Sequence, residues 1–419
     1  MHERRIPEWL RHAPAPSVRG FAVLAGLEAV ARGILISVIP LLMYRTLGDA
    51  QLVSSIYFAF GVVSLLVGLM VPWLIRFLPR RWMYTCGAVM YISGSLIAIL
   101  DTPAAVVVAV GLNTVAIVVT FVCFNAYVLD YIAKIDLGKC ETSRMLYSAA
   151  GWTAGPAIGV LLYAWWPALP FLIAAFSCAS MLAMFWYLRL GNGKLITRAR
   201  APAPNPVAFL TRFFVQPRLV AGWLFAVIRS CGWWIYVVYL PIFAIENGLS
   251  DQLGGILLSA TNACLFSAPL ILRWMLRRSL RQSVQTGFAL AGMTFCAAAV
   301  LSGWPAISVA ALMLGSFFLI VLDVCGGLPF LMAVKPSERT EMSAVYSSFR
   351  DVSGILTPGG AWLVLIVAPT SGIFLVGGLA MFGAWAIASR LHPRLGQARV
   401  SMEPPRAPAL PMTPDAPSV

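Results

Sequence analysis

The sequence predicts an all-α membrane protein in which twelve transmembrane helices form two pseudo-symmetric six-helix bundles. Three observations lead to this prediction: the composition, a series of long apolar runs, and an internal repeat. The chain is 60% hydrophobic and only 11% charged, whereas a soluble domain has about 25% charged residues. Only helices and closed barrels satisfy every backbone polar group in lipid. The alternating pattern of a membrane barrel does not occur, so helices are predicted.

Each apolar run has roughly 18 or more residues, enough to cross a hydrocarbon core about 30 Å thick. The predicted spans are 20–44, 51–75, 82–100, 104–132, 144–164, 168–188, 219–245, 253–276, 284–302, 305–333, 342–367 and 371–391. We therefore divide the chain into five parts: an N-terminal segment (1–19), a first bundle (20–188), a linker (189–218), a second bundle (219–391) and a Pro-rich, disordered tail (392–419).

The basic residues explain the net charge of +14 without a nucleic-acid partner. Of the 30 Lys and Arg residues, 26 lie in the two terminal segments, the even-numbered loops and the linker, while the odd-numbered loops hold only Arg45. Positive charge accumulates on the cytoplasmic side of membrane proteins. We therefore expect both termini and the linker in the cytoplasm, and the chain in the plasma membrane, which is the inner membrane in bacteria.

An internal repeat with an offset of 197 residues relates the two bundles. The stretch "PWLIRFLPRR" from Pro72 matches "PLILRWMLRR" from Pro269, and "AVAR" ending at Arg32 matches "AVIR" ending at Arg229. The first of these matches places equivalent basic residues in the loops after the second and eighth spans: Arg76, Arg80 and Arg81, and Arg273, Arg277 and Arg278. The chain thus reads as a duplication of six helices.

Charged residues inside the predicted spans are the strongest candidates for a functional site. Each costs roughly 2.5 to 3.5 kcal/mol to insert near a helix centre, so it usually faces a cavity or a partner. The set consists of Glu28, Arg32, Asp130, Arg229, Asp323, Arg350 and Asp351.

The sequence gives no sign of catalysis. It contains no GxxxxGK[ST], no HExxH and no credible pair of nucleophile and base. All three histidines lie in the terminal segments and the cysteines show no CxxC spacing, so we expect no metal site, no cofactor and no enzyme activity.

The chain resembles the major facilitator superfamily over nearly all of its membrane portion. The six-plus-six duplication, the linker and the basic loop after the second span fit that family, and "GWTAGPAIG" resembles the glycine-proline motif of its antiporters. The family's basic loop normally has a glycine and an aspartate where this chain has Val71 and Ile75. The resemblance implies secondary transport of a small molecule by alternating access across the lipid bilayer. We expect the protein to be a monomer.

Glu28 and Arg32 are four residues apart, so they share one helix face in the order that favours an ion pair. A structural pair is one interpretation. The other interpretation is functional, because Arg229 matches Arg32 in the repeat while Phe225 stands where Glu28 would be matched. A structural pair needed by both halves would be expected twice. Paired arginines in the predicted spans 20–44 and 219–245 resemble those of the superfamily's organophosphate-phosphate antiporters. We hypothesise that both arginines bind an anionic group and that Glu28 carries a coupling proton.

Asp323 and Arg350 fall at similar depths, so they could form a structural pair between the predicted spans 305–333 and 342–367, or a gate in which Arg350 changes partner. Asp351, next to Arg350, points in another direction. Asp130 lies one turn before Lys134, which favours anchoring of a loop or of an inner gate.

Gly151, Gly155 and Gly159 form a smooth stripe that lets another helix backbone approach closely, and Pro156 adds a bend. In the second half, Gly354 has the comparable place. The stripe has two interpretations. It either serves only helix packing, or it allows the helix to flex in a way that prevents leak through the transporter. Tyr147, Trp152, Trp233 and Tyr346 are candidates for lining a cavity, with ordinary packing as the alternative.

Three functional classes follow from these features. Proton-coupled antiport that exports an organic compound is favoured by the glycine-proline motif in the predicted span 144–164 and by the acidic residues in the membrane. Uptake or exchange of an organic anion is favoured by the matched arginines. A receptor or scaffold that transports nothing would require all charges to be paired and the cavity to be closed.

Overall fold

The computed structural model describes residues 17–391 except for 76, 133–136, 189–205, 327, 335–341 and 343–344. Arg76, the side chain of Asp130, most of the predicted N-terminal segment and linker, and the tail predicted to be disordered lie outside the described residues. All regular structure among the described residues is helical, which confirms the predicted fold class.

The first half consists of six helices, followed by a short helix in the linker. They are α2 (Val18–Leu47), α3 (Ala50–Leu74), α4 (Arg80–Ala98), α5 (Pro103–Tyr131), α6 (Leu137–Trp165), α7 (Leu169–Tyr187) and α8 (Pro206–Phe214). The second half is more interrupted. It contains α9 (Pro217–Trp234), the π-helix η3 (Ile235–Tyr239), α10 (Leu240–Glu246), α11 (Leu253–Ala263), the 3-10 turn η4 (Cys264–Ser267), α12 (Ala268–Leu276), α13 (Leu280–Val300), the 3-10 turn η5 (Leu301–Gly303), α14 (Pro305–Cys325), α15 (Leu328–Ala333), α17 (Phe349–Leu365) and α18 (Ser371–Ala388).

Nine helical segments in the described part of the chain are long and apolar enough to cross a membrane. The other three predicted spans coincide with helices that miss this criterion for physical reasons. α4 begins with two arginines, α11 and α12 are separated by the turn η4, and α17 has only 17 residues. The structure is therefore consistent with the predicted twelve spans.

The first long helix shows how local sequence sets the helix ends. The hydroxyl of Ser17 accepts a hydrogen bond from the backbone N–H of Gly20 at 3.3 Å, which caps the start of α2. At the other end Gly48 has φ of 70°, and its N–H donates to the carbonyl of Tyr44. Glycine adopts this left-handed conformation without strain, so the chain can turn sharply toward α3.

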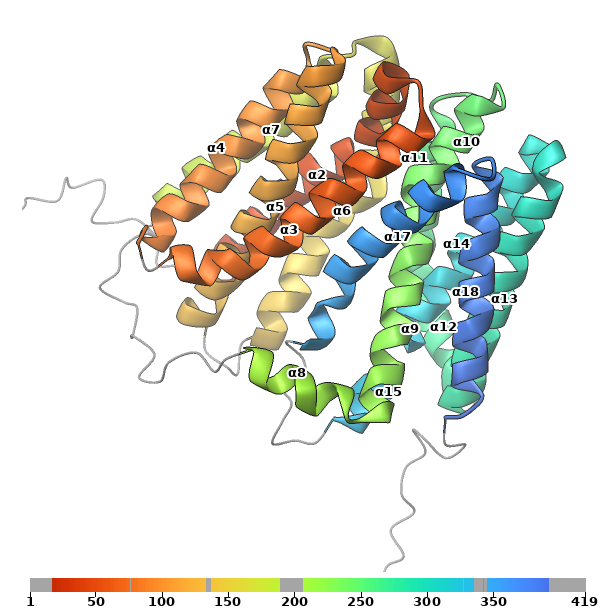
Figure 1. Ribbon diagram of the computed structural model, residues 1–419. Coiled ribbons are helices and arrows are strands. Elements are labelled where there is room, and N and C mark those ends of the chain that lie inside the picture. The colour runs from red at the N-terminus through yellow and green to blue at the C-terminus, as the bar shows by residue number, and fades with distance from the viewer. Residues whose placement is uncertain are drawn as a thin grey trace, which may run out of the picture.

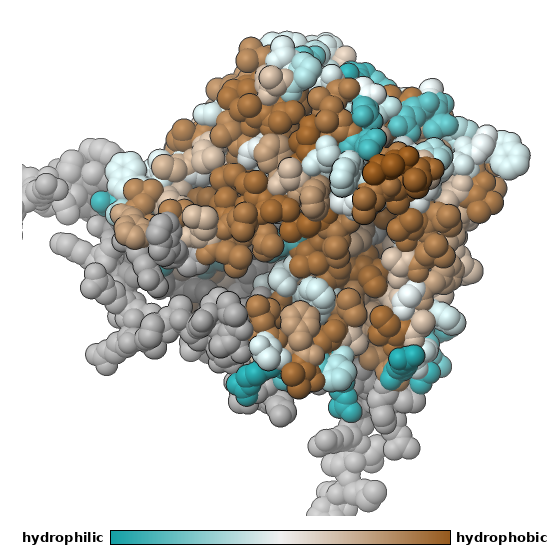
Figure 2. Space-filling view, in the orientation of Figure 1, coloured by the Kyte–Doolittle hydropathy of each residue, from teal (hydrophilic) through white to brown (hydrophobic). Residues whose placement is uncertain are grey.

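The two halves lie side by side, and the first residues of α2 and the last residues of α18 are at the same end of the molecule (Figure 1). We call this end the termini face and the opposite end the far face. α3 of the first half packs against α17 of the second, and α6 packs against α11. Hydrophobic side chains cover most of the face shown in Figure 2, as expected of an integral membrane protein.

The predicted glycine stripe of α6 packs directly against the backbone of α2. A Cβ atom on Gly155 would lie 2.6 Å from the carbonyl carbon of Gly33, and one on Gly159 would lie 2.2 Å from the carbonyl oxygen of Ile34. The close helix approach predicted from the stripe is therefore confirmed.

A second close approach joins the two halves. A Cβ atom on Gly61 of α3 would lie 2.5 Å from the carbonyl oxygen of Gly354 on α17. Gly354, the predicted counterpart of this stripe in the second half, thus lies at the contact between the two halves. The stripe of α6, by contrast, packs within its own half.

The span from α9 to α10 is interrupted by the π-helical turn η3, which follows the 18 residues of α9 and precedes the 7 residues of α10. Pro241 follows within α10, and a proline has no N–H to continue the α-helical ladder. Such turns occur mostly as single interruptions of α-helices, frequently at functional sites. Here η3 separates the longer segment α9, nearer the termini face, from the short segment α10, which reaches the far face.

Candidate functional site

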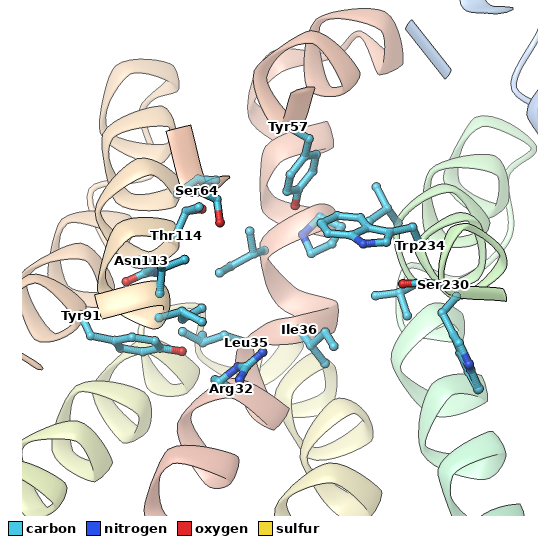
Figure 3. A pocket seen from close by; sticks show the side chains of 18 of the residues that line it. Arg32, Leu35, Ile36, Tyr57, Ser64, Tyr91, Asn113, Thr114, Ser230 and Trp234 are labelled. Atoms are coloured by element: carbon cyan, nitrogen blue, oxygen red, sulfur yellow. The ribbon is translucent and has the colours of Figure 1, made fainter. Parts of the chain in front are cut away.

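A cavity of about 410 Å³ lies between the two halves. Its size falls in the range of roughly 300 to 1,000 Å³ of small-molecule sites. Helices α2, α3, α4, α5 and α6 supply lining residues from the first half, and α9 with η3 supplies them from the second. Figure 3 shows Tyr91 and Arg32 toward one end of the cavity and Tyr57 toward the other. Most of the lining is apolar or aromatic.

Arg32 is the one charged side chain among the described residues that line this cavity. Its Nη1 atom lies 3.2 Å from Oε1 of Glu28, and its guanidinium lies 5.3 Å from the ring centroid of Trp152. The Arg32 side chain is 31% exposed and that of Glu28 is 20% exposed. The ion pair predicted from the four-residue spacing is therefore present, and the arginine keeps a solvent-accessible surface toward the cavity.

Asn113 of α5 is a polar lining residue that sequence reasoning missed. It is only 3% exposed, and neither atom of its amide group has a hydrogen-bond partner among the described residues. Its Oδ1 lies beside Gly94 of α4, where an added Cβ would be 2.5 Å away. A buried amide without a partner costs roughly 1 to 3 kcal/mol, so Asn113 is a polar group in the cavity wall whose hydrogen-bonding capacity is unused among the described residues.

Arg229 forms an ion pair with Asp323 beside the cavity. The Nε atom of Arg229 lies 3.0 Å from Oδ1 of Asp323, and its Nη1 donates to the carbonyl of Leu322 at 3.4 Å. The indole N–H of Trp233 donates to Oδ2 of the same aspartate at 3.1 Å. Because Trp233 also lines the cavity, one side chain connects the ion pair to the cavity.

The two repeat-related arginines therefore have different surroundings. Arg229 is not among the described residues that line the cavity, and its side chain is only 12% exposed. In this structure Arg32 and Arg229 do not share one anion site. Phe225, which stands where Glu28 would be matched, is fully buried in the hydrophobic core, so the second half has no equivalent of the Glu28–Arg32 pair.

The expected pair between Asp323 and Arg350 does not form, because Asp323 binds Arg229 instead. The physical reason is the arrangement of helices, since α9 packs against both α14 and α17 and so supplies the nearer cation. Arg350 is exposed and has no ion pair with a described carboxylate. The like charges of Arg32 and Arg229 both repel its guanidinium. Asp351 is half-buried.

Polar contacts join the two halves near the far face. Arg45 forms an ion pair with Asp251, and the hydroxyl of Tyr44 donates to Glu246 at 3.3 Å. Deeper in the contact, the buried hydroxyl of Tyr239 donates to that of Ser54 at 3.0 Å.

The predicted basic loops lie at the termini face, and their arginines differ in environment. Arg80 packs over the ring of Tyr127 at 5.2 Å, and the exposed Arg81 lies 6.0 Å from the ring of Trp82. In the second half Arg273, Arg277 and Arg278 are all exposed.

The Major Facilitator Superfamily profile matches residues 21–358, which is most of the chain. The chain belongs to the major facilitator superfamily. A search of curated protein sequences found no significant match.

Solved structures of major facilitator proteins share the fold at low sequence identity. A peptide transporter POT in complex with sulfate has a TM-score of 0.71 and 14% identity, covering 93% of this chain and 98% of its own. The nucleoside transporter NupG has a TM-score of 0.68 and 14% identity, covering 90% and 99%. A bacterial homologue of the iron transporter ferroportin, in an inward-facing state, has a TM-score of 0.68 and 13% identity, covering 89% and 97%.

Family membership settles the broad function. This major facilitator protein is an integral membrane transporter and not an enzyme, as the sequence predicted.

Of the four aromatic candidates in this major facilitator, Trp152 and Trp233 line the cavity. Tyr147 is 47% exposed, and Tyr346 stacks on Phe330 with ring centroids 4.0 Å apart. Tyr57, Tyr91 and Trp234 line the cavity and were missed. Asn113 could have been found from the sequence, because an amide in the middle of an apolar span raises the same question as a charge.

Side chains of the opposite half bind two backbone groups of α6 beside Pro156. Because proline has no N–H, the carbonyl of Trp152 lacks its usual helical donor. The side-chain amide of Asn262 on α11 donates to this carbonyl at 2.6 Å. One residue further on, the N–H of Ala157 donates to the hydroxyl of Ser259 at 2.8 Å. The segment of α6 around Pro156 is thus a polar junction between the halves.

We predict that Pro156 and Asn262 act as a unit. Replacing Asn262 with alanine leaves the Trp152 carbonyl without a donor and should cost about 1 to 3 kcal/mol of stability. In a Pro156→Ala background the new N–H can donate to that carbonyl, so Asn262→Ala should cost much less. Thermal unfolding of the four purified proteins measures the difference.

Asn247→Ala is the matched control for this cycle, because the Asn247 amide donates to Phe243 within its own segment at 2.8 Å. Its cost should be the same with proline or alanine at position 156. Strictly additive effects of Pro156→Ala and Asn262→Ala would contradict the proposed unit.

Proposed function

We propose that this transporter takes up a small amphipathic organic anion together with a proton, by alternating access. The observation that carries the proposal is the partly exposed guanidinium of Arg32 in a cavity otherwise lined by apolar, aromatic and uncharged polar side chains. A guanidinium suits a carboxylate or phosphate group, and it binds through charge-assisted hydrogen bonds. The aromatic walls suit an apolar or ring-shaped body, and the Asn113 amide can bind one further polar group.

The Glu28–Arg32 pair supplies a route for proton coupling. Protonating Glu28 removes its charge and releases Arg32 to the anion, while an anion on Arg32 makes protonation of Glu28 easier. Such coupling is reciprocal, so the proton and the anion bind best together and travel in the same direction. With the termini in the cytoplasm, the contacts at the far face would close the outer side, and the cavity would face inward.

Export by proton antiport is the second candidate, favoured by the glycine stripe of α6 that packs tightly on α2. It requires substrate and proton to compete for one site, and then binding of substrate would release a proton rather than take one up. Whether the protein takes up or releases a proton when substrate binds therefore distinguishes the two candidate functions.

We predict that Arg32→Gln weakens binding of aromatic carboxylates by about 10- to 100-fold, the loss of a hydrogen bond to a charged group. Wild-type protein should bind each carboxylate better than its uncharged amide, and the variant should lose this preference. Binding is measured by thermal shift and isothermal titration on purified protein. Arg19→Gln, at the exposed start of the same helix, is the matched control and should bind as wild type does.

The proton is followed with a pH-sensitive dye when the carboxylate is added. Wild type should take up protons, and Glu28→Gln should bind the carboxylate without proton uptake. Unchanged carboxylate binding in Arg32→Gln would overturn the anion site, and proton release by wild type would favour the antiport candidate.

A further inference from the structure

Two grooves open on the outer surface of the second half, near the termini face and away from the central cavity. The first has a volume of about 360 Å³ and an almost wholly apolar lining from α12, α13 and α14, in which Leu270, Phe317 and Phe318 take part. The second has a volume of about 590 Å³ and runs along α13 toward Trp385 of α18. Both are lined by Thr286 and Leu290, so they adjoin one another along α13.

A cationic and amide-rich corner lies at the end of the second groove. Arg278, Gln282 and Gln285 line it there. The Arg278 guanidinium lies 4.9 Å from the ring centroid of Trp274, which lines the first groove. Arg278 is exposed and has no ion pair with a described carboxylate. The corner therefore offers an unneutralised guanidinium and two side-chain amides above two grooves.

The charge around this corner has one sign in the described part of the chain. Arg273, Arg277 and Arg281 lie within five residues of Arg278 along the sequence, and none forms an ion pair with a described carboxylate. An anion is the complementary partner, since a basic residue near the membrane surface attracts anionic lipid with about 1 kcal/mol.

We propose that this corner is a binding site for an anionic phospholipid. The phosphate binds Arg278 with hydrogen bonds from Gln282 and Gln285, and the acyl chains lie in the two grooves that meet at Thr286 and Leu290. A phospholipid fits both features at once, because its negative head group lies at the membrane surface and its two chains extend into the hydrocarbon region. The proposal does not depend on the substrate or on the direction of transport.

The site also differs from the equivalent place in the first half. Arg81 matches Arg278 in the internal repeat and is likewise exposed beside a tryptophan, Trp82. It lines neither groove. The ring of Trp82 instead lies 5.6 Å from that of Trp186. Arg81 therefore offers a control with the same residue type, exposure and position in the repeat.

The experiment is native mass spectrometry of the full-length purified protein with added phospholipid. Wild type is expected to retain dioleoyl phosphatidylglycerol better than dioleoyl phosphatidylcholine. Arg278→Gln should weaken the binding of phosphatidylglycerol about fivefold, which corresponds to the loss of one basic contact of about 1 kcal/mol. Arg81→Gln should bind it as wild type does.

Chain length provides the second measurement, because the grooves can contribute only if they hold the acyl chains. Wild type should bind dioleoyl phosphatidylglycerol more tightly than dihexanoyl phosphatidylglycerol, which is too short to fill the grooves. The proposal is overturned if Arg278→Gln and Arg81→Gln lose equal amounts of binding, if the zwitterionic lipid binds as well as the anionic one, or if both chain lengths bind equally.

Discussion

Replacing Gly155 with valine is expected to leave almost no folded transporter. A Cβ atom at this position would lie 2.6 Å from a backbone carbon of α2, and backbone cannot move aside as a flexible side chain can. The two helices would have to separate, which would also break the contacts of Gly151 and Gly159 with α2. We expect a loss of more than about 4 kcal/mol, a large part of the 5 to 15 kcal/mol that stabilises a typical protein.

Ala154→Val provides the control, because Ala154 is the preceding residue on the same helix and is exposed on the surface. It should change stability by no more than about 0.5 kcal/mol. Both variants are compared by the yield of monodisperse protein in size-exclusion chromatography and by thermal unfolding. A Gly155→Val protein with wild-type yield and unfolding temperature would show that the α2–α6 contact is not as rigid as the structure implies.

Replacing Asp323 with alanine should abolish transport and destabilise the second half. The change leaves Arg229, whose side chain is only 12% exposed, without its carboxylate. Removing one partner of a fully buried pair costs about 3 to 5 kcal/mol. Because the Asp323 side chain is 34% exposed, we expect a smaller cost, about 1 to 3 kcal/mol. Uptake into proteoliposomes and thermal unfolding measure the two effects.

The double variant Asp323→Ala, Arg229→Ala makes this prediction specific to the pair. It should be more stable than Asp323→Ala alone, because no uncompensated charge remains. The Arg45–Asp251 pair at the far face is the comparison, since its side chains are 46% and 32% exposed. Asp251→Ala should cost no more than about 1 kcal/mol. A double variant less stable than both single variants would argue against direct pairing of Arg229 with Asp323.

The sequence predicted the features of the fold that depend on local pattern. The spans follow from apolar runs of sufficient length, and the stripe of Gly151, Gly155 and Gly159 follows from the helical repeat. The Glu28–Arg32 pair was also predictable from the helical repeat, because two residues four apart are neighbours on one helix face. None of these inferences needs knowledge of which helices are neighbours.

The other contacts of the candidate site could not be predicted without knowing which helices are neighbours. Asp323 was expected to pair with Arg350 from depth alone, but depth does not say which helix lies next to α14. The internal repeat related Arg32 to Arg229, yet a repeat fixes position in a bundle and not the local contacts of each side chain. The turn η4 and the π-helix η3 were not predicted, since neither has a distinct apolar pattern.

The π-helix has a consequence for how one span can change shape. A π-helical turn holds one residue more than an α-helical turn, which is equivalent to a single inserted residue. If η3 tightened to α-helical geometry, the segment beyond it would turn by about 100° and shift by about 1.5 Å along its axis. Glu246 at the end of α10 would then swing away from Tyr44. A change of winding at η3 would thus break the contact between Glu246 and Tyr44, about two turns further along the chain, with no movement of the helix as a whole.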